Sequence, residues 1–89
     1  MVYLVTYDLK SPGRNYNDLY EQIKQLGTAW AHPLESVWFI DTPHSSATEI
    51  GNRLRSFMDD NDGLFVVLMT GNYYGFLNKE IWPWLKNRL

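Results

Sequence analysis

The pattern of hydrophobic and polar positions divides the chain into four apolar runs and two amphipathic segments. The run Val2–Asp8 is rich in β-branched and aromatic residues and leads into Pro12 and Gly13, which predicts a strand followed by a turn. Residues 28–32 and 36–41 predict two further strands, joined around Pro33 as a hairpin. Residues 64–69 predict a fourth strand, and the apolar run at 37–40 should lie inside a sheet because both of its faces are apolar.

The amphipathic segments predict helices. In residues 17–26 the apolar side chains return at helical spacing, and Gly27 stands where helices commonly end. Ser46 and Glu49 match a capping box, which predicts a second helix that runs to about Met58. Residues 78–89 are expected to form a short helix, provided that Pro83 falls in its first turn.

This order of elements, β-α-β-β-α-β with a C-terminal helix, is that of a ferredoxin-like α+β fold in one domain spanning residues 1–89. Right-handed crossovers give an antiparallel sheet with the strand order 4-1-3-2. Two helices then cover one face, and the other face is also too apolar to meet water. A second copy of the chain, the C-terminal segment or a ligand such as RNA bases would cover it. We predict a homodimer whose interface includes Tyr3, Tyr7, Trp82 and Trp84.

Composition narrows the functional classes. The chain has no cysteine, which excludes disulfides and thiol chemistry and favours the cytoplasm. No apolar stretch approaches the length of a membrane span, so we expect no membrane partner. Ten acidic residues against eight basic ones give a net charge of −2, and this balance disfavours binding nucleic acid mainly through phosphate contacts.

The candidate for chemistry is Asp8, at the end of the first strand. A carboxylate there suits a ligand for Mg²⁺ or a general base, and the alternative is an Asp that caps the turn after it. Lys10 and Arg14 flank that turn, either as phosphate contacts or as solvated charges. Strand directions place His32, Glu35 and the acidic turn 59–62 at the same rim as Asp8, and His44 at the opposite rim. We expect the acidic turn to be solvated rather than a calcium site.

The stretches Tyr3–Leu9, Pro12–Gly13 and Asn15–Tyr16, with Ser36–Trp38 and the tail at Trp84–Lys86, resemble a group of short bacterial and prophage proteins labelled SinR-like. More distantly, Tyr7-Asp8-Leu9 is similar to the small CRISPR adaptation subunit and its VapD-like and GhoS-like ribonuclease relatives. That resemblance implies a ferredoxin-like homodimer in which Asp8 binds Mg²⁺ at the interface.

Two functions follow as hypotheses. The first is a dimeric, metal-assisted endoribonuclease of a phage-defence or toxin-antitoxin system, in which Asp8 of each subunit holds Mg²⁺ and Lys10 or Arg14 contacts RNA. The second is a non-enzymatic protein-binding module, such as an antitoxin, immunity or inhibitor protein, which uses the apolar sheet face. The acidic charge of the chain favours the second hypothesis.

Overall fold

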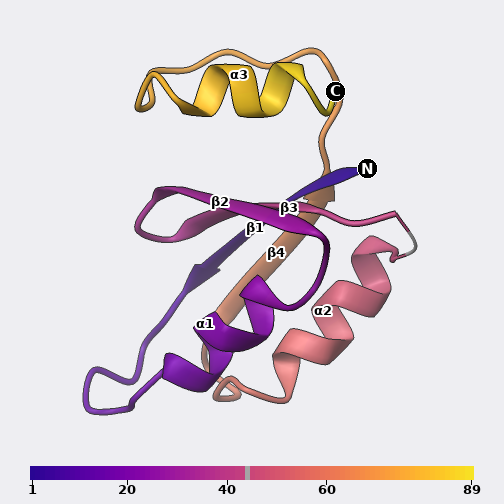
Figure 1. Ribbon diagram of the computed structural model, residues 1–89. Coiled ribbons are helices and arrows are strands. Elements are labelled where there is room, and N and C mark those ends of the chain that lie inside the picture. The colour runs from indigo at the N-terminus through magenta and orange to yellow at the C-terminus, as the bar shows by residue number, and fades with distance from the viewer. Residues whose placement is uncertain (44) are drawn as a thin grey trace.

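The computed structural model describes residues 1–43 and 45–89. Its elements are β1 (Val2–Asp8), α1 (Asn17–Lys24), β2 (Ala29–Leu34), β3 (Val37–Asp41), α2 (Ala47–Arg55), β4 (Gly63–Leu68) and α3 (Ile81–Lys86). The strands form one antiparallel sheet in the order β2-β3-β1-β4 (Figure 1), which confirms the predicted ferredoxin-like arrangement. His44 lies outside the described residues, so the prediction for it stays a prediction.

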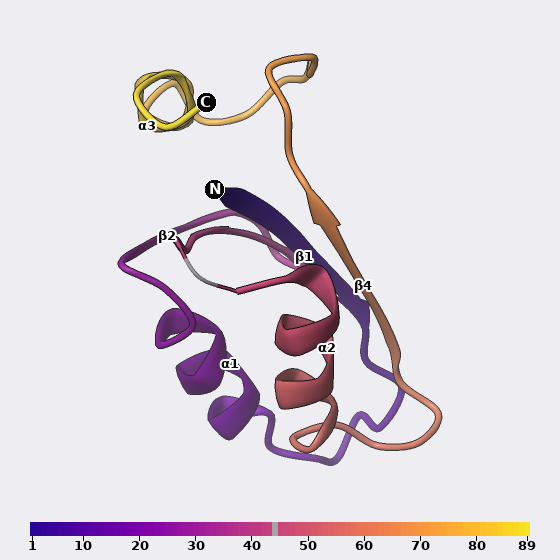
Figure 2. The same cartoon turned by 90° about the vertical axis from the view of Figure 1, so that its right-hand side faces the viewer.

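The sheet separates two layers of helices. Helices α1 and α2 lie on one side of it and α3 on the other, as the edge-on view shows (Figure 2). Alternate residues of β1 therefore enter different cores. Tyr3, Val5 and Tyr7 pack on the side of α1 and α2, where the larger cluster of buried apolar side chains is found.

This placement changes the expectation for two of the predicted interface residues. Tyr3 and Tyr7 are buried within the single chain under α1 and α2, and each hydroxyl donates to a backbone carbonyl, of Ser45 and Glu35 respectively. They are core residues of the face that the two helices cover. The alternation of residues along β1 predicts two sets of side chains on opposite faces, but it does not show which set points toward the helices.

A second core lies between the sheet and α3. Its buried members are Val2, Ala31, Phe39, Ile81 and Leu85. Trp82 and Trp84 pack at its margin and are partly buried, with the Trp84 ring stacked near Phe39 at a centroid distance of 6.4 Å. The C-terminal segment thus covers part of the second sheet face, one of the three coverings that the sequence left open.

Several element boundaries differ from the sequence prediction. Strand β2 continues through Pro33 to Leu34, with a register shift between Ala31 and Leu34, because proline is tolerated at a sheet edge. Helices α1 and α2 end earlier than expected, at Lys24 and Arg55. Ser46 caps α2 by accepting a hydrogen bond from Glu49 N, and Pro83 falls in the first turn of α3, as predicted.

Gly27 has a different role from the expected helix-ending one. None of the described glycines has a positive φ, so Gly27 does not form a left-handed helix cap. A Cβ at this position would lie 2.1 Å from the carbonyl oxygen of Asp41. Close approach of two backbone segments, rather than a special dihedral angle, requires glycine here.

Within the described residues, none of the helices α1, α2 and α3 combines the length and the apolar character that crossing a bilayer requires.

Candidate functional site

The rim at the end of β1 is held by two aspartates of the turn after α2. Asp62 is only 8% exposed, and its carboxylate accepts hydrogen bonds from the Tyr16 hydroxyl, Lys10 N and Asp59 N. Asp59 accepts from the Ser11 hydroxyl and from Arg14. The expectation of a solvated acidic turn is therefore wrong for these two residues. They tie the loop after β1 to the turn before β4.

This network argues against the turn-capping interpretation of Asp8. The turn after β1 is held by Asp59 and Asp62, and none of the side-chain hydrogen bonds in the described chain uses Asp8 as a cap. The Asp8 side chain is 75% exposed, and its carboxylate lies 3.7 Å from Lys10 Nζ. Asp8 thus stands at the rim with an accessible carboxylate and one cationic neighbour.

Arg14 is occupied by contacts within the chain. Its guanidinium pairs with Asp59, donates to Phe57 O at 3.1 Å and lies over the Tyr16 ring at 5.3 Å from the centroid. A phosphate group would have to compete with Asp59 for this side chain. Lys10, which within the described residues pairs with the exposed Asp8 alone, is the more accessible of the two predicted phosphate contacts.

A hollow of about 320 Å³ opens beside Asp8. Its lining includes Glu35, Tyr20 and Ser36 in addition to Tyr7 and Asp8. Glu35 comes from the turn between β2 and β3, which antiparallel geometry brings to the end of β1. The structure therefore places a second carboxylate at the same hollow, within one chain. The sequence indicated a shared rim for these two residues but gave Glu35 no role.

Two aromatic side chains, Tyr7 and Tyr20, line this hollow, and Trp38 packs against both of them. Trp38 Nε1 donates to the Tyr7 hydroxyl at 3.0 Å, and the rings of Tyr20 and His32 stack on Trp38. Burial raises the pKa of Tyr7 above its ordinary value of 10.0, and the nearby Glu35 carboxylate acts in the same direction. The Tyr7 hydroxyl is therefore a neutral group near neutral pH. His32 packs against the ring of Trp38 and does not join Asp8 in a cluster of metal ligands.

The larger accessible feature is the sheet face on the side of α3. Helix α3 covers only part of it, and the remainder presents apolar side chains from all four strands. We call this remainder the open face; it consists of Thr6 and five apolar residues, Leu4, Leu34, Val37, Phe65 and Val67. Phe65 is 62% exposed and Leu34 52%. Strand pairing joins these residues into a continuous strip, because Leu34 lies opposite Val37, Val37 opposite Thr6, and Thr6 opposite Phe65.

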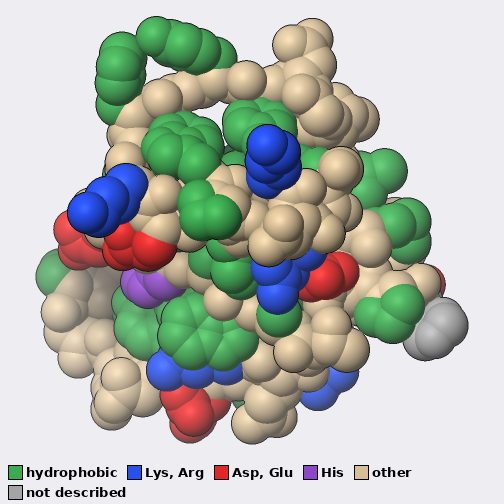
Figure 3. Space-filling model, turned by 45° about the horizontal axis from the view of Figure 1, so that its top comes forward, with side chains coloured by type: hydrophobic (Ala, Val, Ile, Leu, Met, Phe, Trp, Pro, Cys, Tyr) green, Lys and Arg blue, Asp and Glu red, His purple; other side chains and the backbone are tan. Residues whose placement is uncertain are grey.

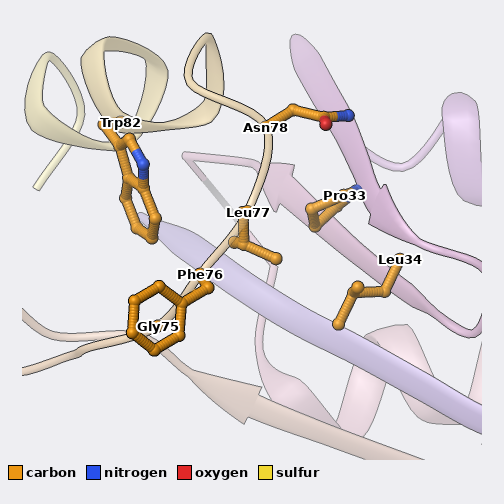
Figure 4. Close-up of a pocket in the computed structure, with 7 residues that line it drawn as sticks. All are labelled: Pro33, Leu34, Gly75, Phe76, Leu77, Asn78 and Trp82. Atoms are coloured by element: carbon orange, nitrogen blue, oxygen red, sulfur yellow. The ribbon is translucent and has the colours of Figure 1, made fainter.

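The open face continues into a hollow of about 490 Å³ beside α3 (Figure 4). Pro33 and Leu34 line one side of it, and Phe76, Leu77 and Trp82 line the other. Asn78 contributes an amide at its border. The side of the molecule that carries α3 shows hydrophobic side chains between separate basic and acidic groups (Figure 3). Most of the side chains that line this hollow are apolar, and Asn78 and the indole of Trp82 add polar groups.

The rim has few side chains that could act as ligands for a metal ion. No three His, Asp or Glu side chains come together in residues 1–43 and 45–89. Mg²⁺ commonly takes one or two protein carboxylates and completes its shell with water and phosphate oxygens. Asp8 and Glu35 fit that requirement by type and by their common hollow, whereas the ammonium group of Lys10 competes with a cation for Asp8.

Comparison of the chain with models of known protein families finds no match, and comparison with curated proteins finds none either. The resemblance to the SinR-like group, and the more distant one to ribonucleases, therefore stay predictions.

Proposed function

We propose that this protein is a non-enzymatic protein-binding module and that the open face is its binding surface. The observation that carries the proposal is the exposure of Phe65 and Leu34 within a continuous apolar strip on the sheet. Scattered apolar side chains are ordinary on a protein surface, but contiguous apolar patches are typical of interaction sites.

The chemistry of the surface indicates what it binds. The open face itself contains no charged residue, so a partner would contact it through apolar side chains. The hollow between Leu34 and Trp82 is large enough to receive an aromatic anchor, the kind of residue that dominates many protein interfaces. The net charge of −2 supports a protein partner over nucleic acid, in keeping with an antitoxin, immunity or inhibitor protein of the cytoplasm.

Affinity purification of the tagged protein from its native cells tests this function. We expect one protein to co-purify in a stoichiometric amount and to be lost with Leu34→Asp, which places a charge at the β2 end of the strip, beside the hollow next to α3. Asn52→Asp, on the exposed surface of α2, is the matched control and should retain the partner. Absence of a stoichiometric partner, or equal retention by both variants, would contradict the proposal.

A second candidate function is favoured by Asp8. Its carboxylate is exposed and shares a hollow with Glu35, which is an arrangement compatible with metal-assisted cleavage of RNA. A bound Mg²⁺ would supply Lewis acidity and lower the pKa of a water molecule. Asp8 and Glu35 would hold the ion, and Lys10 would contact a phosphate oxygen. If the ion instead lies between two subunits, as the sequence predicts, the second carboxylate comes from Asp8 of the other subunit.

Cleavage assays with single-stranded RNA and Mg²⁺ separate the two functions. The ribonuclease function predicts activity that Asp8→Asn and Glu35→Gln each reduce by at least about 100-fold, while Asp60→Asn, at an exposed position of the neighbouring turn, leaves it unchanged. The binding-module function predicts no Mg²⁺-dependent cleavage in any of these proteins. Cleavage that Asp8→Asn leaves intact would remove the ribonuclease mechanism.

A further inference from the structure

The two edges of the sheet are chemically different. Strand β2 forms one edge and β4 the other. In β2, Pro33 lacks a backbone N–H and the register shifts between Ala31 and Leu34, and both features hinder pairing with another strand. Strand β4, Gly-Leu-Phe-Val-Val-Leu, contains no charge, no proline and no register shift. It therefore lacks the usual devices that protect an edge strand.

The backbone direction of β4 follows from its pairing with β1. Met69 N donates to Val2 O at 2.8 Å, immediately beyond the end of β4. Because backbone groups alternate along a strand, Phe65 and Val67 also direct their N–H and C=O groups toward β1. Leu64, Val66 and Leu68 direct theirs away from the sheet. Since β4 pairs only with β1 among the described strands, these three residues present an open row of donors and acceptors.

There is room for a neighbour along this edge. A hollow of about 260 Å³ lies between α2 and β4, lined by Ala47, Thr48, Gly51, Leu64, Phe65 and Val66. A Cβ placed on Gly51 would meet no atom within 4 Å. The hollow therefore leaves space beside α2 for side chains of an added strand.

We propose that β4 pairs with β4 of a second copy of this chain, antiparallel and around a two-fold axis at Val66. In that register Val66 lies opposite Val66 and Leu64 opposite Leu68, so the outward groups of each copy meet those of the other. The strand is self-complementary because no residue from Gly63 to Leu68 is charged, and like charges are not brought together. The result is one continuous sheet across two chains.

The difference between the edges limits the assembly to two copies. Pairing through β4 makes the unprotected edge strand of each chain an interior strand. The paired sheet then ends in a β2 strand on both sides, where Pro33 and the register shift hinder further pairing. An unprotected strand at both edges would instead favour open-ended aggregation. The arrangement also keeps the two Asp8 carboxylates apart, because Asp8 lies opposite Gly63 at one end of each β4. Their separation is more than about 20 Å, too far to share one metal ion.

This pairing is separate from the proposed binding function. Edge pairing uses the backbone of β4, whereas binding uses side chains of the open face, which remain exposed in the pair. The two copies of Phe65 and Val67 become neighbours across the new strand junction and enlarge the apolar surface. A partner can bind with or without edge pairing, so the two proposals can fail independently.

Sedimentation velocity of the purified protein from about 1 to about 100 µM tests edge pairing. Wild type should be a dimer, and Val66→Pro, which removes one outward N–H and leaves the β1 ladder intact, should weaken association at least about 10-fold. Val66→Ala retains the N–H and should stay dimeric, as should Leu34→Asp. A monomer at 100 µM, open-ended aggregation, or equal association of Val66→Pro and Val66→Ala would overturn the proposal.

Circular dichroism checks whether Val66→Pro is folded. If this variant does not fold, amide hydrogen exchange of the wild type tests edge pairing instead. Amide hydrogen exchange of wild type should slow at Leu64, Val66 and Leu68 as the concentration rises, because these amides become hydrogen-bonded in the pair. The amides of residues 49–53 in α2 serve as the control and should not change with concentration. Exchange at Leu64, Val66 and Leu68 that is independent of concentration would contradict edge pairing.

Discussion

At the scale of single residues, Gly27 is the glycine with the least space for a side chain. A Cβ there would lie 2.1 Å from Asp41 O, and that oxygen also accepts hydrogen bonds from Thr28 N and the Thr28 hydroxyl. The backbone contact joins the start of β2 to the end of β3. Glycine at this site is therefore a packing requirement of the hairpin.

Gly27→Ala should lower the free energy of unfolding by about 2 kcal/mol, because the backbone at Asp41 has to move to admit a methyl group. Gly13→Ala is the control, since a Cβ at Gly13 would meet no atom within 4 Å. Urea titration of both variants measures the difference. Equal free energies of unfolding for the two variants would show that the backbone at Asp41 moves aside without loss of stability, which contradicts the prediction.

The raised pKa of Tyr7 predicts that the stability of the fold depends on pH in the alkaline range. Burial raises its pKa in the folded chain above the unfolded value of 10.0, so the folded protein holds the phenolic proton more tightly. The contribution of Tyr7 to stability is complete below the unfolded pKa and is lost as pH rises through the folded pKa. Thermal unfolding from about pH 8 to about pH 11 should show a steeper loss above pH 10 in wild type than in Tyr7→Phe. Identical slopes would contradict this assignment.

At the scale of elements, the loop after β1 and the turn before β4 form one unit. Asp62 joins them through hydrogen bonds from Tyr16, Lys10 N and Asp59 N, and Arg14 adds a contact with Asp59. The geometry of the rim around Asp8 depends on this unit. Loss of Asp62 should therefore affect both the stability of the fold and the shape of the rim.

Asp62→Ala should destabilise the protein by about 2 to 4 kcal/mol, because it leaves the Tyr16 hydroxyl and two backbone N–H groups without their buried acceptor. Asp60→Ala, in the same turn, removes only an exposed pair with Arg55 and should change stability by less than about 0.5 kcal/mol. Calorimetry of the two variants gives the comparison. A small effect at Asp62 would mean that water replaces its hydrogen bonds.

The elements themselves were largely predictable, and their polar connections were not. Strand and helix periodicity identified every element, and the capping box located the start of α2, because these signals are local in sequence. The partners of Asp62 lie up to 52 positions away, at Lys10 and Tyr16, so no local pattern distinguishes a buried aspartate from a solvated one. Alternation along β1 likewise showed two apolar faces without showing that Tyr3 and Tyr7 meet the helices.

At the scale of the whole molecule, α3 covers part of the second sheet face. Leu85 and Ile81 are buried in one cluster with Phe39 and Val2. Arg88 forms an ion pair with Asp41, with 3.2 Å between Arg88 Nε and Asp41 Oδ2. The sequence offered the C-terminal segment as one possible cover. It could not show how much of the face would stay open, because that depends on the path of residues 69–80.

Leu85→Ala should lower the free energy of unfolding by about 2 to 4 kcal/mol, since Leu85 is 1% exposed and its removal leaves a cavity between α3 and the sheet. Leu89→Ala is the control at an exposed position of the same segment and should have little effect. Denaturant unfolding followed by tryptophan fluorescence measures both. If the two variants match, α3 is not docked on the sheet in solution.

We propose that the open face, rather than the rim at Asp8, is the binding surface of the protein. Chemical-shift mapping of the labelled chain with its co-purified partner tests this claim most directly. We predict that the largest amide shifts fall on residues of the open face, namely Leu4, Leu34, Val37, Phe65 and Val67. Shifts concentrated on Asp8, Lys10 and Glu35, with the open face unchanged, would contradict the account.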